Sequence, residues 1–149
     1  MRRGVRLALD LGERRIGVAR CDADGIMALP LDALDATSAT WPQRVQELVE
    51  EYGAFEVVVG NPVSLRGTEE IASANVRTKV QLLLPVLTVP IRLVDERLTT
   101  ATAAKALREA GHTTRSARGR IDSAAAVTLL EFALDIERRT GAAAGELPT

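Results

Sequence analysis

Three short apolar runs with the composition of β-strands follow one another in the first 34 residues, before any helical pattern occurs. We predict strands at 5–11, 16–22 and 26–34, with a glycine-containing hairpin turn at 23–25. Pro30 indicates a sheet edge or a break in the third strand, because proline cannot donate a hydrogen bond to a neighbouring strand. These runs therefore predict an antiparallel meander at the start of the fold.

Helical and strand patterns alternate after the meander. We expect a helix at 41–52, a strand at 55–60, a helix at 68–84, a strand at 90–96, and helices at 101–110 and 121–139. Alternation of this kind implies crossover connections and a parallel part of the sheet with helices on both faces. The sequence predicts a single α/β domain over residues 1–140, with a mixed five-stranded sheet and a disordered tail at 141–149.

Composition limits the functional classes. The chain has 149 residues, one cysteine and one histidine, so Cys21 and His112 cannot build an internal disulfide or a Cys/His zinc site. We interpret Cys21 as an ordinary strand residue and His112 as a loop residue. No apolar run approaches the ~18 residues of a membrane span, and no signal-peptide pattern is present. We therefore expect a cytoplasmic protein without a membrane partner.

Two groups of arginines are candidates for binding nucleic acid. The net charge is −1, so any surface that binds nucleic acid must be local. The candidates are Arg14 and Arg15 after the first strand, and Arg115, Arg118 and Arg120 in a stretch without acids. Such clusters bind phosphates, although a solvated loop is the alternative. Aromatic residues make up 3% of the chain, which argues against a base-stacking platform.

Carboxylates stand at the ends of two predicted strands. Asp10 lies near the end of the first strand, before Gly12, and the last strand ends in Asp95 and Glu96. Ligands of α/β sheets gather at the carboxyl ends of the parallel strands. Asp95 and Glu96 cannot both face one site, because successive side chains alternate across a sheet. The alternation by itself leaves open which of the two contributes.

Asp122 is a third candidate acid, in the first turn of the last predicted helix. The small residues at 124–126 let that helix lie close to the sheet, which would bring Asp122 near the strand ends. The alternative is an acid favoured at a helix N-terminus by the helix dipole. The convergence of three acids at one end of the sheet favours a site.

Four segments together resemble the YqgF (RuvX-like) family, whose members have the RNase H fold. The resemblance covers roughly residues 5–139 and lies in Asp10-Leu11-Gly12 with Arg15-Ile16-Gly17-Val18-Ala19, Gly60-Asn61-Pro62 with Gly67, Asp95-Glu96-Arg97-Leu98-Thr99-Thr100, and Ile121-Asp122 with Ala124-Ala125-Ala126. It implies that Asp10, Glu96 and Asp122 form a catalytic acidic triad that binds metal. One departure is that Arg118 and Arg120 stand where the family pattern has lysines.

The resemblance implies a nuclease that processes the 5′ end of pre-16S rRNA, or a Holliday junction resolvase homologue. Carboxylates are suitable ligands for Mg²⁺ or Mn²⁺, and two ions are expected, with Asp10 bridging them. The expected partner is structured RNA, with branched DNA as the alternative. Junction resolution requires a homodimer, whereas a processing nuclease can act as a monomer. A third hypothesis is a non-catalytic RNA-binding factor in transcription or ribosome assembly.

Overall fold

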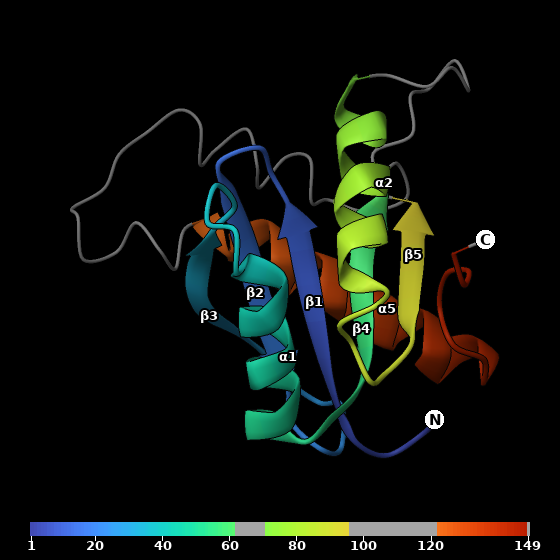
Figure 1. The fold of residues 1–149 in the computed structure, drawn as a ribbon. Helices are drawn as coiled ribbons and strands as arrows, with labels where there is room; N and C mark the ends of the chain where they lie inside the picture. The colour runs from blue at the N-terminus through green and yellow to red at the C-terminus, as the bar shows by residue number, and fades with distance from the viewer. Residues whose placement is uncertain (62–70, 96–121, 149) are drawn as a thin grey trace.

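The fold is built on a five-stranded mixed sheet with the strand order β3-β2-β1-β4-β5 (Figure 1). The computed structural model describes residues 1–61, 71–95 and 122–148. β1 and β3 run antiparallel to β2, while β4 is parallel to both β1 and β5. The predicted meander is confirmed, and Pro30 lies on the edge strand. The strands are β1 (Val5–Leu11), β2 (Arg15–Cys21), β3 (Ala28–Asp35), β4 (Ala54–Asn61) and β5 (Ile91–Asp95).

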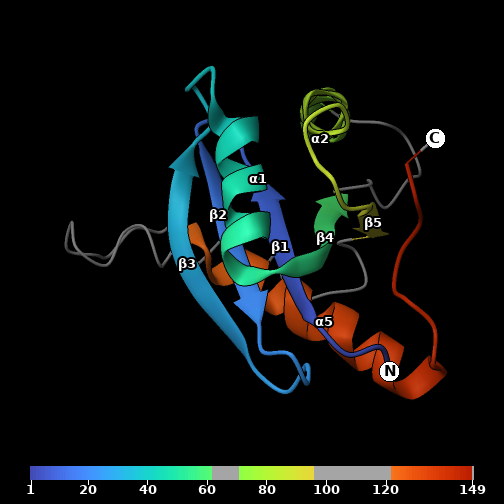
Figure 2. The ribbon, with the colours of Figure 1, turned by 60° about the horizontal axis from the view of Figure 1, so that its bottom comes forward.

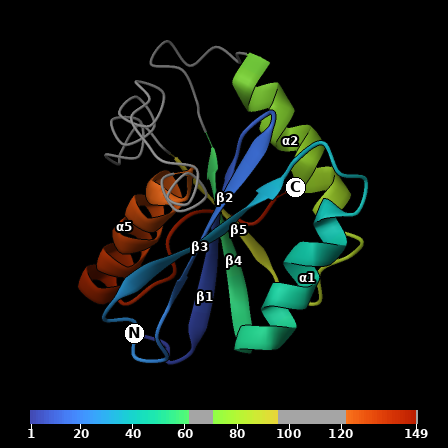
Figure 3. The same cartoon turned by 90° about the vertical axis from the view of Figure 1, so that its left-hand side faces the viewer.

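Helices cover both faces of the sheet. α1 (Trp41–Tyr52) and α2 (Ile71–Leu83) pack on one face, and α5 (Ala124–Thr140) packs on the other (Figures 2 and 3). The predicted helix at 101–110 and the expected start of α2 at residue 68 lie outside the described residues. Across 1–61, 71–95 and 122–148, no helix is both long and apolar enough to cross a membrane.

Alternation along β1 divides the core into two layers. Leu7 and Leu9 are buried against α1 and α2, whereas Ala8 is buried against α5. On the α5 side the contact is made largely by small residues, including Ala19 and Ala126. Their size lets α5 approach the sheet closely, as the alanine-rich segment predicted. Residues of β1 with even numbers therefore face α5, and Asp10 is one of them.

The β2–β3 turn is longer than predicted. The Asp22 carboxylate accepts hydrogen bonds from the backbone N–H groups of Met27 and Ile26, both at 2.8 Å. These bonds lower the pKa of Asp22, the bond from Met27 contributing most. They also hold residues 26 and 27 in the turn, so β3 begins at Ala28 instead of residue 26. Gly25 adopts the left-handed conformation that the turn requires, with φ of 66°.

Two buried glutamates meet arginines at the end of the sheet where β1 begins. Arg2 donates two hydrogen bonds of 3.0 Å to Glu56 and one of 2.5 Å to Glu137. The buried Arg6 guanidinium also donates to Glu137. Both arginines stack over the Phe55 ring, 4.8 Å from its centroid. We call Arg2, Arg6, Glu56 and Glu137 the arginine–glutamate network; it ties the N-terminal segment to β4 and α5.

The C-terminal segment runs along the free edge of β5. Glu146 and Leu93 exchange two backbone hydrogen bonds, of 2.7 and 2.9 Å. Ala144 is buried in the α5 core layer, and Gly145 turns with φ of 77°. This segment thus differs from the expected disordered tail, because Glu146 pairs with the open edge of β5 and Ala144 is buried.

Candidate active site

Asp10 is a buried carboxylate on the α5 face of the sheet. Asp10 is 3% exposed and lies one residue before the end of β1. In the antiparallel register of β1 and β2, its partner is Gly17. A buried carboxylate needs a compensating partner, because removing a charge from water is costly. Asp10 lies near the end of the first strand, as the sequence predicted.

Asp122 reaches the same place from the start of α5. Its backbone passes directly over Gly17: a Cβ atom built on that glycine would lie 2.3 Å from the Asp122 carbonyl oxygen. Gly17 thus separates the two acids, being the strand partner of Asp10 and the contact of Asp122. The structure brings these two predicted acids to one face at one end of the sheet.

Arg15 lies beside the acids, while Arg14 is exposed in the turn before β2. The Arg15 Nε atom is 3.6 Å from the Asp122 carboxylate, and 52% of the Arg15 side chain is exposed. An ion pair of this length and exposure is weak. Arg15 therefore stands where an anion approaching Asp122 would meet it.

Alternation along β5 bears on the choice between its two terminal acids. Leu93 packs with the α1 and α2 layer, and Val94 packs with the α5 layer. Asp95 therefore follows on the face opposite Asp10. Glu96 lies outside the described residues, as do Arg115, Arg118 and Arg120. Within the described parts of the chain, His, Cys, Asp and Glu form no group of three suited to a metal ion.

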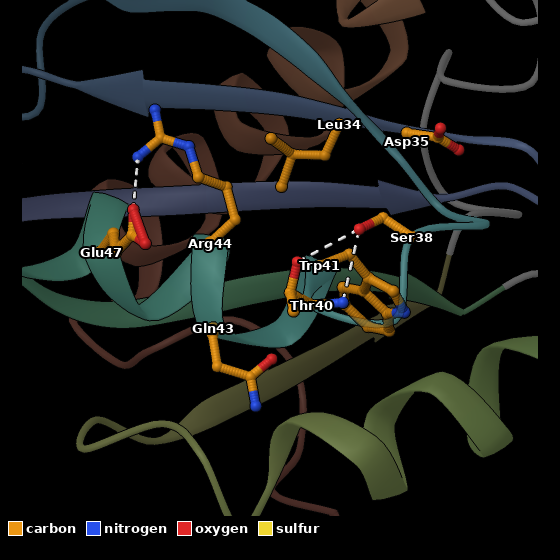
Figure 4. A pocket seen from close by; sticks show the side chains of 8 residues that line it. All are labelled: Leu34, Asp35, Ser38, Thr40, Trp41, Gln43, Arg44 and Glu47. Carbon is orange, nitrogen blue, oxygen red and sulfur yellow. Dashed lines mark hydrogen bonds and ion pairs between the residues drawn. The ribbon is translucent and has the colours of Figure 1, made fainter.

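A cleft of about 500 Å³ lies away from these acids, beside the start of α1 (Figure 4). Its charged residues are Asp35, Arg44 and Glu47, and the latter two form an ion pair of 3.2 Å. Hydrogen bonds from the Thr37 hydroxyl and N–H, with the charge of Arg15, lower the pKa of Asp35. Two acids and one base give this cleft a net negative charge, which does not favour phosphate.

Thr40, on the rim of this cleft, occupies the N-cap position of α1 as the sequence predicted, but its side chain makes no capping hydrogen bond. Pro42, the second helical residue, has no N–H to donate, and the Thr40 hydroxyl is instead hydrogen-bonded to that of Ser38, at 3.2 Å. Ser38 also accepts a hydrogen bond of 3.3 Å from the Thr40 N–H (Figure 4).

Ser123 is a site residue that the sequence analysis did not single out. It is fully buried next to Asp122, and its hydroxyl binds backbone atoms of both β2 and β3. In the sequence it reads only as a small residue before an alanine run. Its role depends on the β2–β3 register, which no local pattern encodes.

The chain is similar to known proteins over nearly its whole length. Residues 4–136 match the family described as RuvX, Holliday junction resolvase. A relative from Thermobifida fusca is 50% identical over 155 residues, covering 99% of this chain and 97% of the relative. A Streptomyces coelicolor relative is 49% identical over 150 residues, covering 98% and 89%. Both carry the name "Putative pre-16S rRNA nuclease".

The fold is also that of a solved structure, T. thermophilus RuvC in complex with Holliday junction substrate. The TM-score is 0.58 at 16% identity, with 96% of this chain and 99% of RuvC covered. This likeness confirms the predicted RNase H-like fold. Because the family match spans residues 4–136 and the relatives align almost end to end, the chain belongs to the RuvX family.

Proposed function

We propose that this protein is a metal-dependent nuclease that hydrolyses phosphodiester bonds of structured nucleic acid. The observation that carries the proposal is the meeting of Asp10 and Asp122 across Gly17 at one end of the sheet. The names of the RuvX relatives favour the same chemistry. We assign the activity to a single domain over residues 1–140, in the cytoplasm, where ribosomal RNA is processed.

The acids suit a divalent metal ion. Asp10 and Asp122 supply oxygen ligands from two different elements, β1 and α5, and Mg²⁺ and Mn²⁺ prefer such ligands. We propose that Glu96 completes the set and that two ions bind, Asp10 being shared between them. Bound ions of this kind activate a water molecule and stabilise the leaving oxygen in phosphodiester hydrolysis.

The arginines position the substrate in this proposal. Arg15 is exposed beside Asp122, and Arg14 is the exposed residue before it in the chain; both would hold phosphates that flank the scissile bond. Arg15 would exchange its long ion pair with Asp122 for a phosphate when metal occupies the acids. We assign the same phosphate-binding role to Arg115, Arg118 and Arg120.

Pre-16S rRNA is the substrate we favour, in 5′-end processing during ribosome biogenesis. The support is that the relatives at 49–50% identity carry that name over nearly their full length. Holliday junction resolution is the second candidate, supported by the family description and by the RuvC-like fold. It requires a symmetric dimer with two active sites. A non-catalytic RNA-binding role is the third candidate.

Cleavage of two labelled substrates tests the proposal: a 5′-extended 16S rRNA precursor and a four-way DNA junction, each with Mg²⁺ or Mn²⁺. We expect cleavage by the wild type and only background cleavage by Asp10→Asn. Asp24→Asn is the matched control, since Asp24 is an exposed acid at the opposite end of the sheet. Cleavage retained by Asp10→Asn refutes the site. Folded wild-type protein that cleaves neither substrate supports the RNA-binding role instead.

A further inference from the structure

The β2–β3 ladder is interrupted beside the candidate site. Ile16 pairs with Leu34, but Val18 pairs with Leu31, so two steps along β2 correspond to three along β3. This is the pattern of a β-bulge, in which an extra residue locally disrupts the hydrogen bonds between strands. The interruption falls at Gly17, the strand partner of Asp10.

The Ser123 hydroxyl fills this interruption. It accepts a hydrogen bond of 3.0 Å from the Val18 N–H and donates one of 2.6 Å to the Leu31 carbonyl oxygen. Ser123 has 0% exposure; its bond with the Val18 N–H is buried, and its bond with the Leu31 carbonyl oxygen is partly buried. One side chain of α5 is thereby joined to two neighbouring strands at once.

Because the Ser123 side chain binds the sheet, it does not cap its own helix. It is the N-cap residue of α5, and its carbonyl oxygen accepts a helical hydrogen bond from the Val127 N–H at 3.0 Å. A serine here normally accepts a bond from the first helical turn with its side chain. The Ser123 side chain makes no such bond and is turned to the sheet.

Gly17 and Ser123 together fix the start of α5 in two directions. Any side chain on Gly17 would collide with the Asp122 carbonyl oxygen, at 2.3 Å, and approach the Ser123 Cα atom to 3.1 Å. The lack of a side chain on Gly17 lets the start of α5 approach β2, and the hydrogen bonds of the Ser123 hydroxyl hold it there. Asp122 precedes Ser123 directly in the chain, so a shift of Ser123 is passed on to its backbone.

We propose that Ser123 is a positioning residue, which sets the Asp122 carboxylate relative to Asp10 by anchoring α5 in the β2–β3 bulge. This inference rests on the proposed metal-dependent function of the two acids. Residues that orient metal ligands typically change metal affinity by ~10–100-fold when they are lost. We therefore expect Ser123→Ala to weaken metal binding by about that factor while the sheet and α5 persist.

Direct Mn²⁺ titration, by calorimetry and without nucleic acid, tests this inference. Ser123→Ala is compared with the wild type and with Thr128→Ala, which removes a half-buried hydroxyl of α5 that donates a hydrogen bond to the Ala124 carbonyl oxygen one turn away. We expect Ser123→Ala to bind Mn²⁺ ~10–100-fold more weakly and Thr128→Ala to bind like the wild type. Ser123→Cys, close to serine in size, replaces Ser123→Ala if that variant does not fold.

The outcomes separate this inference from the proposed function. Wild-type protein that binds no Mn²⁺ and cleaves neither substrate refutes the proposed function. Wild-type binding with an unchanged affinity in folded Ser123→Ala overturns the positioning role alone. An equal loss in Thr128→Ala also overturns it, because the effect would then follow from helix stability. Under the positioning role, the metal concentration for half-maximal cleavage rises with the weaker Mn²⁺ affinity, and the KM for nucleic acid stays near the wild-type value.

Discussion

Glu137→Gln is expected to destabilise the protein strongly, although Glu137 lies far from the candidate site. The residue is 3% exposed, and its carboxylate receives hydrogen bonds from the Arg2 and Arg6 guanidinium groups. The substitution leaves the buried charge of Arg6 facing a neutral amide. Breaking a buried pair by removing one partner costs ~3–5 kcal/mol. Most of this loss belongs to Arg6, because the Arg2 side chain is partly exposed and keeps Glu56.

Asp135→Asn is the matched control on the same helix. Asp135 pairs with Arg139 at 2.7 Å one turn away, and both side chains are exposed. Such pairs contribute about 0.3–0.5 kcal/mol, so this variant should unfold almost like the wild type. A change of 1 kcal/mol shifts the Tm of a chain this long by about 2–4 °C, so Glu137→Gln should lower it by about 6–20 °C.

Urea unfolding followed by circular dichroism measures both variants. We expect the unfolding midpoint of Glu137→Gln to fall with little change in the slope, since the surface exposed on unfolding stays the same. A loss below ~1 kcal/mol, or a loss equal to that of Asp135→Asn, would falsify the reasoning about buried charge. The double variant Arg6→Met/Glu137→Met should recover much of the loss, because two apolar side chains leave no unmatched charge.

Three further outcomes are expected. Gly17→Ala should lower the free energy of unfolding, measured with urea, by ~1–3 kcal/mol. It should also reduce the cleavage rate of the protein that remains folded, because the added Cβ would lie 2.3 Å from the Asp122 carbonyl oxygen and displace it. Asp22 has a lowered pKa, so it stabilises the fold above its unfolded-state pKa of about 3.9 and loses this effect as the pH falls through the lowered value. In Asp22→Asn, the Tm should therefore fall less steeply than in the wild type as the pH is lowered from about 3.9. Gly145→Ala should release the C-terminal segment, since its Cβ would lie 2.3 Å from the Leu93 carbonyl oxygen, and hydrogen exchange at Leu93 should accelerate.

Local patterns predicted most of the described strands and helices because buried strands are short apolar runs and α1 carries apolar residues at helical spacing. α1 was predicted with its observed bounds, Trp41–Tyr52, since Pro42 marks its first turn and Gly53 its end. The burial of Asp10 also follows from alternation along β1. The prediction of where β3 begins failed because a side chain binds nearby backbone: Ile26 is apolar, but its N–H donates to the Asp22 carboxylate, which keeps Ile26 in the turn.

Contacts across the chain could not be read from the sequence. Arg2 and Glu137 are separated by 135 positions, and only the packing of α5 on the sheet joins them. Ser123 meets Val18 and Leu31 because a bulge in the β2–β3 ladder leaves room for its hydroxyl. Both cases depend on strand register, which is a property of the assembled sheet rather than of any one segment.

The two ends of β1 carry different kinds of buried charged residue: Arg6 belongs to the arginine–glutamate network, and Asp10 belongs to the candidate active site. Arg6 and Asp10 lie on the same face of this strand, four residues or about 13 Å apart. At the Arg6 end, short hydrogen-bonded ion pairs hold two buried glutamates, so these acids are not available to ligate a cation. At the Asp10 end, the ion pair between Arg15 and Asp122 is longer, at 3.6 Å, and largely exposed on the arginine side. The Arg15 guanidinium can therefore leave Asp122 for a phosphate at little cost, because an exposed ion pair of this length is weak. The arrangement implies that changes in the arginine–glutamate network should lower stability without lowering the metal affinity of the folded protein. Changes at Gly17 or Ser123 should lower the metal affinity of the protein that remains folded, in addition to any loss of stability.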